Sequence, residues 1–297
     1  PGRASPFSAP ARRRSEAVSG HLQAEARIVD THNSGKGQMK GATVTHLDRS
    51  AGTGVPSVAP DCRIYAIGDI HGRFDLLMEL LGKICADADA RRDHRRTRIV
   101  FLGDYIDRGE NSGEVLRTLT DIAAFGSGGI VFLRGNHEDA LRAFLVSPTK
   151  GAAWLDYGGL QTLASLGIRP PQASLGKQDL FRVREELATA ISAFEPLFDA
   201  MVNSHRCGDV VFTHAGVDPS RSLEDQPPGT LLWGHAQARV DTPVPGLRVV
   251  HGHYDAREPV SRSGRICVDT GAYYSNRLTA VRLDDAECFL STGGAGE

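Results

Sequence analysis

Five short polar motifs recur along the chain, and each contains side chains that can bind a metal ion. They read Gly-Asp-Ile-His-Gly at 68–72, Gly-Asp-Tyr-Ile-Asp-Arg-Gly at 103–109, Gly-Asn-His-Glu at 135–138, His-Ala-Gly at 214–216 and His-Gly-His at 251–253. Taken singly, each motif is weak, because a Gly-Asp after a strand is usually a turn and short motifs match by chance. Together they offer carboxylate, amide and imidazole ligands, a set that suits two divalent transition-metal ions better than one.

The spacing of the first three motifs fits consecutive strand–helix units. Asp69 and Asp104 are 35 residues apart, and Asp104 and Asn136 are 32 residues apart. One strand–helix–strand unit takes roughly 30 residues or more. Because the carboxyl ends of parallel strands meet at one edge of a sheet, where α/β proteins place their ligands, we expect the motifs to converge on one site.

The segments between the motifs alternate between strand and helix patterns, which predicts an α/β fold with a largely parallel sheet. Apolar periodicity predicts helices over about 76–84, 115–122 and 138–146. The closing strands are not separated by helical patterns, so we expect an antiparallel part near the C-terminus. The predicted strands are 63–67, 98–102, 130–133, 209–213, 247–250, 266–269 and 278–283.

Composition divides the chain into a leader and a folded body. Residues 1–60 contain eight basic and four acidic residues, few large apolar side chains and many small or helix-breaking ones. Such a segment cannot bury enough apolar surface to fold alone, so we expect a flexible leader. Residues 61–297 are expected to form the body, with the mainly helical 147–207 as a cap insertion over one edge of it.

The overall composition excludes several classes of protein. The chain has 297 residues, of which 40% are hydrophobic, and a formal net charge of -2. These values exclude a wholly disordered chain and give no reason to expect a nucleic-acid or membrane-surface partner, because a large positive field is missing. The five cysteines are scattered and show no Cys-x-x-Cys spacing. The start of the chain does not resemble a secretory signal. Both features favour a cytoplasmic protein.

Three of the motifs together resemble the signature of the calcineurin-like metallophosphoesterases. These are Asp-Ile-His-Gly at 69–72, Gly-Asp-x-x-Asp-Arg-Gly at 103–109 and Gly-Asn-His-Glu at 135–138. Within that family, the chain is most similar to the phosphoprotein phosphatase branch, in particular to bacterial and bacteriophage lambda serine/threonine protein phosphatases. Trp154, Thr162 and the Asp-Thr-Gly at 269–271 add to the resemblance. It covers about residues 61–290 and implies a β-sandwich flanked by helices.

The resemblance implies a ligand set for two divalent metal ions. The mixed nitrogen and oxygen ligands disfavour Ca²⁺ and Mg²⁺, so Mn²⁺ is expected, with Fe or Zn as alternatives. Asp69 and His71 would hold the first ion, and Asp104 would bridge both. The second ion would be held by three further side chains, namely Asn136, His214 and His253. His251 would then support the site without binding a metal.

The implied reaction is hydrolysis of a phosphate ester by direct attack of a hydroxide that bridges the two metal ions. Arg108 would clamp the phosphate, His137 would protonate the leaving oxygen, and Asp107 would stabilise the imidazolium form of His137. Relatives often carry a second clamping arginine shortly after a Leu-Leu-Trp element. Here the Leu-Leu-Trp at 231–233 precedes Gly-His, which leaves His235 or Arg239 for that role.

Three classes of function remain open at this point. The first is a serine/threonine protein phosphatase that acts on phosphorylated proteins or small phosphate esters. The second uses the same chemistry on the phosphoanhydride of a dinucleoside polyphosphate such as diadenosine tetraphosphate. The third is a non-catalytic module that binds phosphorylated partners. The pair of Asp107 and His137 disfavours the third class, because a binding module needs neither an acid nor its supporting carboxylate.

Overall fold

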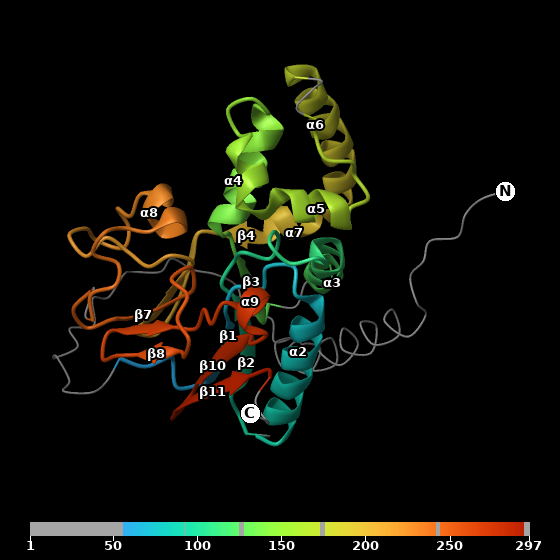
Figure 1. The fold of residues 1–297 in the computed structure, drawn as a ribbon. Coiled ribbons are helices and arrows are strands. Elements are labelled where there is room, and N and C mark those ends of the chain that lie inside the picture. The colour runs from blue at the N-terminus through green and yellow to red at the C-terminus, as the bar shows by residue number, and fades with distance from the viewer. Residues whose placement is uncertain (1–55, 92, 125–127, 173–175, 242–243, 294–297) are drawn as a thin grey trace, which may run out of the picture.

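The computed structural model describes residues 56–91, 93–124, 128–172, 176–241 and 244–293 (Figure 1). Within these ranges the chain forms two β-sheets with helices around them, so the α/β sandwich expected from the sequence is confirmed. Most of the leader predicted for residues 1–60 lies outside the described residues.

The larger sheet has the strand order β11-β10-β1-β2-β3-β4 among the described residues. Strands β1 to β4 run parallel to one another. Strand β10 pairs antiparallel with β1 and with β11, which confirms the antiparallel part expected near the C-terminus. The strands are β1 (Cys62–Ile67), β2 (Arg96–Phe101), β3 (Ile130–Leu133), β4 (Met201–Val202), β10 (Thr279–Leu283) and β11 (Glu287–Ser291).

The smaller sheet has the order β5-β6-β7-β9-β8. Its central strands β6, β7 and β9 are parallel, and the edge strands β5 and β8 are antiparallel to their neighbours. The motifs at 214–216 and 251–253 follow or end two of these central strands. The strands are β5 (Ser204–Cys207), β6 (Val210–Thr213), β7 (Arg248–His251), β8 (Val260–Ser261) and β9 (Arg265–Cys267).

Alternating side chains of β1 divide the apolar core into two layers. Ile64 and Ala66 point into the space between the two sheets, whereas Tyr65 and Ile67 pack against the helices on the other face. This is the period of two expected for a strand that is buried on both faces. Figure 1 shows α2 and α3 on one side of the larger sheet and the smaller sheet on the other. The structure is therefore layered as helices, sheet and sheet.

Helices cover the outer face of the larger sheet and gather at one end of the molecule. In Figure 1, α4, α5 and α6 lie together at that end, beyond β3 and β4. The described residues between 147 and 200 are largely helical, as the sequence predicts, whereas β4 and β5 occupy the end of the predicted 147–207 insertion. The helices are α2 (Phe74–Asp89), α3 (Ser112–Ala124), α4 (Asn136–Val146), the π-helix η1 (Leu155–Gly159), α5 (Leu160–Ser165), α6 (Lys177–Ile191), the 3₁₀-helix η3 (Ser192–Phe194), α7 (Glu195–Ala200), α8 (Pro228–Trp233) and α9 (Ala272–Ser275).

Residues 56–60, which the sequence assigns to the leader, contact the body. Val58 is 6% exposed and belongs to the core between the two sheets. The carbonyl of Ser57 accepts a hydrogen bond from the backbone N–H of Asp209 at 2.9 Å. The packed part of the chain therefore includes Val58, before the boundary that we predicted at residue 61.

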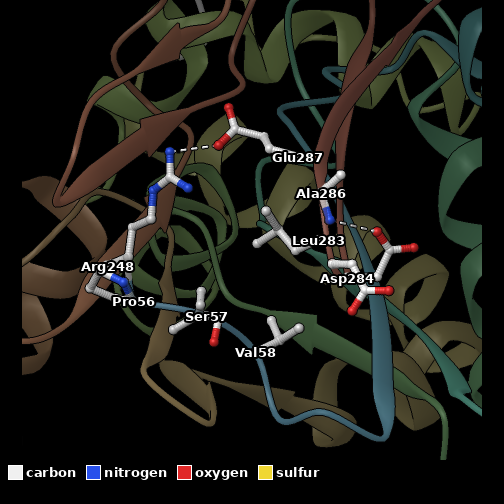
Figure 2. A pocket seen from close by; sticks show the side chains of 10 residues that line it. Pro56, Ser57, Val58, Arg248, Leu283, Asp284, Ala286 and Glu287 are labelled. Atoms are coloured by element: carbon white, nitrogen blue, oxygen red, sulfur yellow. Dashed lines mark hydrogen bonds and ion pairs between the residues drawn. The ribbon is translucent and has the colours of Figure 1, made fainter. Parts of the chain in front are cut away.

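A cavity of about 380 Å³ lies beside residues 56–58, at the amino ends of β6 and β7 (Figure 2). Val58, Val210 and Leu283 line it, and an ion pair of 2.6 Å between Arg248 and Glu287 lies along its wall. Since the polar motifs follow the carboxyl ends of the parallel strands, this cavity is at the opposite end of the sandwich from them.

Candidate metal centre

The five polar motifs meet in space, as their spacing predicts. Each lies immediately beyond the carboxyl end of a parallel strand: Asp69 after β1, Asp104 after β2, Asn136 after β3, His214 after β6 and His253 after β7. All of these side chains except His253 are buried, and His253 is partly buried. The two sheets thus supply one site from five separate loops.

Asp104 lies between two groups of nitrogen ligands. Its Oδ2 atom is 3.5 Å from Nε2 of His71, and its Oδ1 atom is 3.4 Å from Nε2 of His214. The structure groups Asp104 with His71 and His137 on one side and with His214 and His253 on the other as candidate metal ligands. One carboxylate facing two ligand groups is an arrangement in which it can bridge two ions.

Asn136 joins the second group. Its Oδ1 atom lies 2.9 Å from Nε2 of His214 and 3.0 Å from Nδ1 of His253. Asp69 lies close to the same residues, since both of its carboxylate oxygens accept the backbone N–H of His253, at 3.2 and 3.1 Å. The six side chains predicted as metal ligands therefore lie in one cluster, although Asp69 is not in either of the two closest groups.

Hydrogen bonds to Nδ1 of two histidines direct Nε2 of each ring toward the ligand cluster. Nδ1 of His71 donates to the carbonyl of Ile106 at 2.9 Å, and Nδ1 of His214 donates to the carbonyl of Leu102 at 2.8 Å. Nε2 of each ring then faces Asp104, and in the neutral ring this is the nitrogen that can bind a cation. Histidines that bind metals are commonly held in this way by a carbonyl behind the ring. The nitrogen and oxygen donors thus fit divalent transition-metal ions.

The backbone of the motifs is strained. Six non-glycine residues among those described have a positive φ, and five of them belong to the motifs: His71 at 44°, Asp104 at 52°, Asp107 at 73°, Arg108 at 66° and His253 at 64°. Left-handed backbone at such residues costs on the order of 1–3 kcal/mol each and persists only where the surroundings impose it. The neighbouring contacts therefore hold these side chains in place against a local preference.

Glu138 imposes part of this geometry, a role that we did not predict from the sequence. Its side chain is fully buried and accepts the backbone N–H groups of Asp104 at 3.0 Å, Tyr105 at 2.8 Å and Gly135 at 3.0 Å. Burial, together with the nearby charge of Asp104, raises the pKa of Glu138 to about 7. The only sequence signal was its place three residues after Gly135, at the start of a helix.

His137, a member of the first group around Asp104, forms a buried pair with Asp107. Nδ1 of His137 donates to Oδ2 of Asp107 at 2.7 Å. Asp107 also accepts hydrogen bonds from Nε1 of Trp154 at 2.8 Å and from Oγ1 of Thr162 at 2.6 Å. Both partners come from residues 147–207, so part of the predicted cap fixes the carboxylate behind His137.

Arg108 extends over the first ligand group from an exposed position. Its Nη1 atom lies 3.0 Å from Nε2 of His71. Its backbone N–H donates to the carbonyl of Gly158 at 3.4 Å, and a Cβ atom at Gly158 would lie only 2.5 Å from that same nitrogen. The glycine at 158, which has φ of 112°, therefore allows η1 to approach Arg108 closely.

A comparison with known protein families identifies the family of this chain. The family model described as calcineurin-like phosphoesterase matches residues 62–263, which is more than half of the chain. This chain is a calcineurin-like phosphoesterase. The family resemblance expected from the motifs is confirmed, and the chain is a metallophosphoesterase hydrolase of a family that uses divalent metals in a dinuclear centre.

The curated relatives of this phosphoesterase include several bis(5′-nucleosyl)-tetraphosphatases. An asymmetrical enzyme of Bacillus velezensis is 28% identical over 244 residues, which cover 74% of this chain and 89% of the relative. The asymmetrical enzyme of Bacillus subtilis is 28% identical over 237 residues, covering 74% and 91%. A symmetrical enzyme of Nitrosospira multiformis is 25% identical over 285 residues, covering 78% and 97%.

Solved structures of two kinds share the fold of the phosphoesterase. One is a candidate diadenosine tetraphosphatase, with a TM-score of 0.51 and 18% identity over 82% of this chain and all of the other. Another is a serine/threonine phosphatase of Saccharomyces cerevisiae similar to human PP5, with a TM-score of 0.52 and 16% identity, covering 97% and 91%. At these identities the likeness is one of fold, so it does not single out the phosphoprotein phosphatase branch that we expected.

The buried carboxylates and histidines of the phosphoesterase site have shifted pKa values that favour binding of a cation. Burial raises the pKa of Asp69 well above its usual value, and the neighbouring Asp269 raises it further. Burial would also raise the pKa of Asp104, but His214 and His137 outweigh this effect and hold it well below its usual value. Burial would lower the pKa of His214, but Asp104 raises it to about 10. A proton on His214 thus takes the place that a divalent ion would fill.

His235 and Arg239, the two candidates for a second phosphate clamp, differ in their contacts. His235 pairs with Asp218, with Nε2 and Oδ2 4.0 Å apart. The guanidinium carbon of Arg239 lies 5.4 Å from the centre of the Tyr254 ring, and that ring lies 4.7 Å from the ring of His253. Arg239 is thus connected to the ligand cluster through Tyr254, whereas the side chain of His235 faces Asp218.

His251 is buried next to the site, but its contacts differ from those of His253. Its Nδ1 atom donates to the carbonyl of Gly252 at 2.8 Å, and its Nε2 atom has no hydrogen-bond partner among the described residues. It is in neither of the two groups around Asp104.

None of the helices in the described ranges is long and apolar enough to cross a membrane.

Proposed function

We propose that this phosphoesterase hydrolyses the phosphoanhydride chain of dinucleoside tetraphosphates, the second of the three substrate classes left open by the sequence. The observation that carries the proposal is the set of curated relatives, which are bis(5′-nucleosyl)-tetraphosphatases and match this chain over 89–97% of their own length. The protein phosphatase that we first expected has support only from a shared fold.

The ligand cluster is suited to a substrate with several negative charges. When bound, two divalent ions supply Lewis acidity, which lowers the pKa of water and offsets the charge of the phosphate oxygens. Asp69, His71 and Asp104 would hold the first ion. The second would share Asp104 and take the side chains of Asn136, His214 and His253. We expect Mn²⁺ to serve best, because the ligands are mixed nitrogen and oxygen donors.

Arg108 is placed to bind the phosphate that reacts. A guanidinium offers paired N–H donors in the geometry of two phosphate oxygens. Because Arg108 is an exposed residue and its guanidinium contacts His71, it can meet a substrate that enters from solvent. Its strained backbone and the close approach of Gly158 fix the direction from which the guanidinium comes.

His137 is placed to donate a proton to the oxygen that leaves. Nδ1 of the ring is engaged by Asp107, so the proton available for transfer is on Nε2, which lies 3.9 Å from Oδ2 of Asp104. Burial would lower the pKa of His137, but Asp104 and Asp107 outweigh burial and raise it. The imidazolium form that an acid needs is therefore favoured more than in an ordinary histidine.

Incubation of the full chain with diadenosine tetraphosphate and Mn²⁺, followed by anion-exchange chromatography of the nucleotides, tests the proposal. We expect adenine mononucleotides to appear with time, and we expect excess chelator to stop their formation. Asp104→Asn should remove most of the activity, because it removes charge between the two ligand groups. An enzyme that leaves the dinucleotide intact while it hydrolyses another phosphate ester would overturn the proposal.

A further inference from the structure

An exposed aromatic ring lies beside the phosphate-binding end of the site. Tyr273, in α9, is 39% exposed. The guanidinium carbon of Arg108 lies 5.0 Å from the centre of its ring, and the ring of His71 meets it edge-on with centroids 5.6 Å apart. Tyr273 therefore touches both a candidate metal ligand and the candidate phosphate clamp while part of its surface faces solvent.

Three hydrogen bonds hold the segment that contains Tyr273. Nη1 of Arg73 donates to the carbonyl of Ala272 at 2.9 Å and to Oδ1 of Asn276 at 2.7 Å. The backbone N–H of Gly271 donates to the buried carboxylate of Asp269 at 2.9 Å. These contacts fix both ends of α9, so a ligand that binds to the ring does not have to order the segment first, and the entropic cost of binding is smaller.

The next residue also supports the ring. The Tyr274 ring meets that of Tyr273 edge-on, with centroids 5.0 Å apart, and its hydroxyl group donates to the carboxylate of Asp255. Tyr273 thus has neighbours that set its orientation, namely Tyr274, His71 and Arg108. An exposed tyrosine with fixed orientation offers a planar apolar surface at little cost in conformational freedom.

We propose that Tyr273 binds the nucleobase of the nucleotide whose phosphate Arg108 holds, an inference that rests on the proposed function. A nucleobase stacks on an aromatic side chain through its π-face, which every base has, so the contact favours nucleotides without selecting among bases. Arg108 and Tyr273 are neighbours, so phosphate and base would be bound side by side. Tyr273 is then a residue that determines specificity for nucleotides over other phosphate esters.

This placement also assigns the bond that breaks. A ribose separates the base from the first phosphate of the chain, so a base on Tyr273 brings that first phosphate to Arg108. The oxygen of water then forms a bond to this phosphorus, and the bond from the phosphorus to the bridging oxygen breaks. The bridging oxygen leaves with the other three phosphates and takes up a proton. The products are a nucleoside monophosphate and a nucleoside triphosphate.

The competing explanation is that Tyr273 only supports Arg108. Loss of the ring would then weaken the binding of any phosphate, with or without a base. Adenosine 5′-monophosphate and ribose 5-phosphate separate the two explanations, because they share the ribose and the phosphate and differ in the base. Their inhibition constants against a small aryl phosphate, measured on the Mn²⁺-loaded full chain, report binding without depending on turnover of a dinucleotide.

The test compares the wild type with Tyr273→Leu, Tyr273→Phe and the control Phe181→Leu, which changes an exposed aromatic residue of α6. We expect the wild type and the control to bind adenosine monophosphate more tightly than ribose 5-phosphate by about tenfold, in the range of one stacked base. Tyr273→Phe should keep this preference. Tyr273→Leu should lose it through weaker binding of the adenine nucleotide alone.

Several results would overturn the inference. An equal loss of both ligands in Tyr273→Leu would make Tyr273 a support for Arg108, and an unchanged preference would place the base elsewhere. Two molecules of nucleoside diphosphate as the products of the wild type would contradict the assigned bond. The proposed function fails separately, if the wild type leaves diadenosine tetraphosphate intact, so the two failures can be told apart.

Discussion

Nδ1 of His137 lies 2.7 Å from Oδ2 of Asp107, and neither residue is more than 2% exposed. The ring is thereby oriented with Nε2 toward the ligand cluster, and the carboxylate stabilises the charged ring. Trp154 and Thr162 complete the contacts of Asp107 from a part of the chain that is distant in sequence. The pair therefore has the geometry of a proton donor with its supporting carboxylate.

His137→Asn should slow the reaction most for substrates with poor leaving groups. A protonated acid matters when the leaving oxygen is a strong base, as with a serine alkoxide, and general acid catalysis typically contributes about 10²–10⁴-fold. The loss should be much smaller when the leaving group is nitrophenolate or a nucleoside triphosphate, since both leave readily without a proton donor. Turnover of an alkyl phosphate, nitrophenyl phosphate and diadenosine tetraphosphate, with metal content measured in parallel, tests this prediction.

The alternative role for His137 is that of a metal ligand, because the structure groups it with His71 and Asp104. In that case His137→Asn would lose metal and slow all three substrates together. Asp107→Asn is a second, independent test of the role of His137. It should show the same dependence on leaving group in weaker form, because Asp107 acts through His137 and does not touch the substrate.

Glu138→Gln should destabilise the fold around Asp104. The buried carboxylate accepts three well-placed backbone N–H groups, and an amide would turn an N–H₂ group toward at least one of them. Hydrogen bonds to a charged group contribute about 1.5–3 kcal/mol each, so a loss of free energy of unfolding of about that size or more is expected. Urea unfolding of the variant measures it. Glu79→Gln, at an exposed pair with Lys83, is the control and should change stability little. Equal stability of the two variants would rule out this role for Glu138.

Binding of metal should release protons and weaken as the pH falls. The pKa of His214 is raised to about 10, with Asp104 outweighing the effect of burial, so this ring carries a proton at neutral pH. A cation must displace that proton before it can bind the ring. Calorimetric titration of the metal-depleted protein with Mn²⁺ in two buffers of different ionisation enthalpy counts the protons released. An affinity that rises with falling pH would contradict the expected sign.

The point at which the chain is truncated should decide its stability. A protein that begins at Pro56 should unfold at nearly the same temperature as the full chain, because residues 1–55 have the composition of a segment that does not fold alone. A protein that begins at Asp61 loses Val58 from the core between the sheets, and burial of a valine contributes about 1.5–3 kcal/mol. Its Tm should therefore fall by several degrees. Thermal unfolding of the three proteins decides between these outcomes, and a large drop with the first truncation would contradict the prediction.

The ligand cluster could be predicted because its residues follow strands directly. Asp69, Asp104 and Asn136 each lie just beyond a strand whose apolar run is plain in the sequence, so their convergence follows from the parallel topology. The edge strands β4 and β8 have only two residues each and could not be predicted, because pairing partners far along the chain create them. The boundary of the body was placed too late for a similar reason, since Val58 is buried by residues that are distant in sequence.

Supporting residues were harder to foresee than ligands. Glu138 acts through backbone N–H groups that belong to another motif, and a sequence carries no direct signal for such contacts. The place of Tyr273 beside Arg108 depends on α9 being held by Arg73, almost two hundred residues earlier in the chain. We infer that contacts of this kind around the ligand cluster determine the substrate class, which is why the motifs alone left it open.

The most direct test of the central claim compares two substrates on the same preparation of the Mn²⁺-loaded full chain. The measurement is kcat/KM for diadenosine tetraphosphate and for a phosphoserine peptide, each with a chelator control. A phosphoesterase specific for dinucleoside tetraphosphates should show the larger kcat/KM for the dinucleotide, and chelator should abolish both activities. A larger kcat/KM for the phosphopeptide would contradict the proposed function and favour the activity of a serine/threonine protein phosphatase.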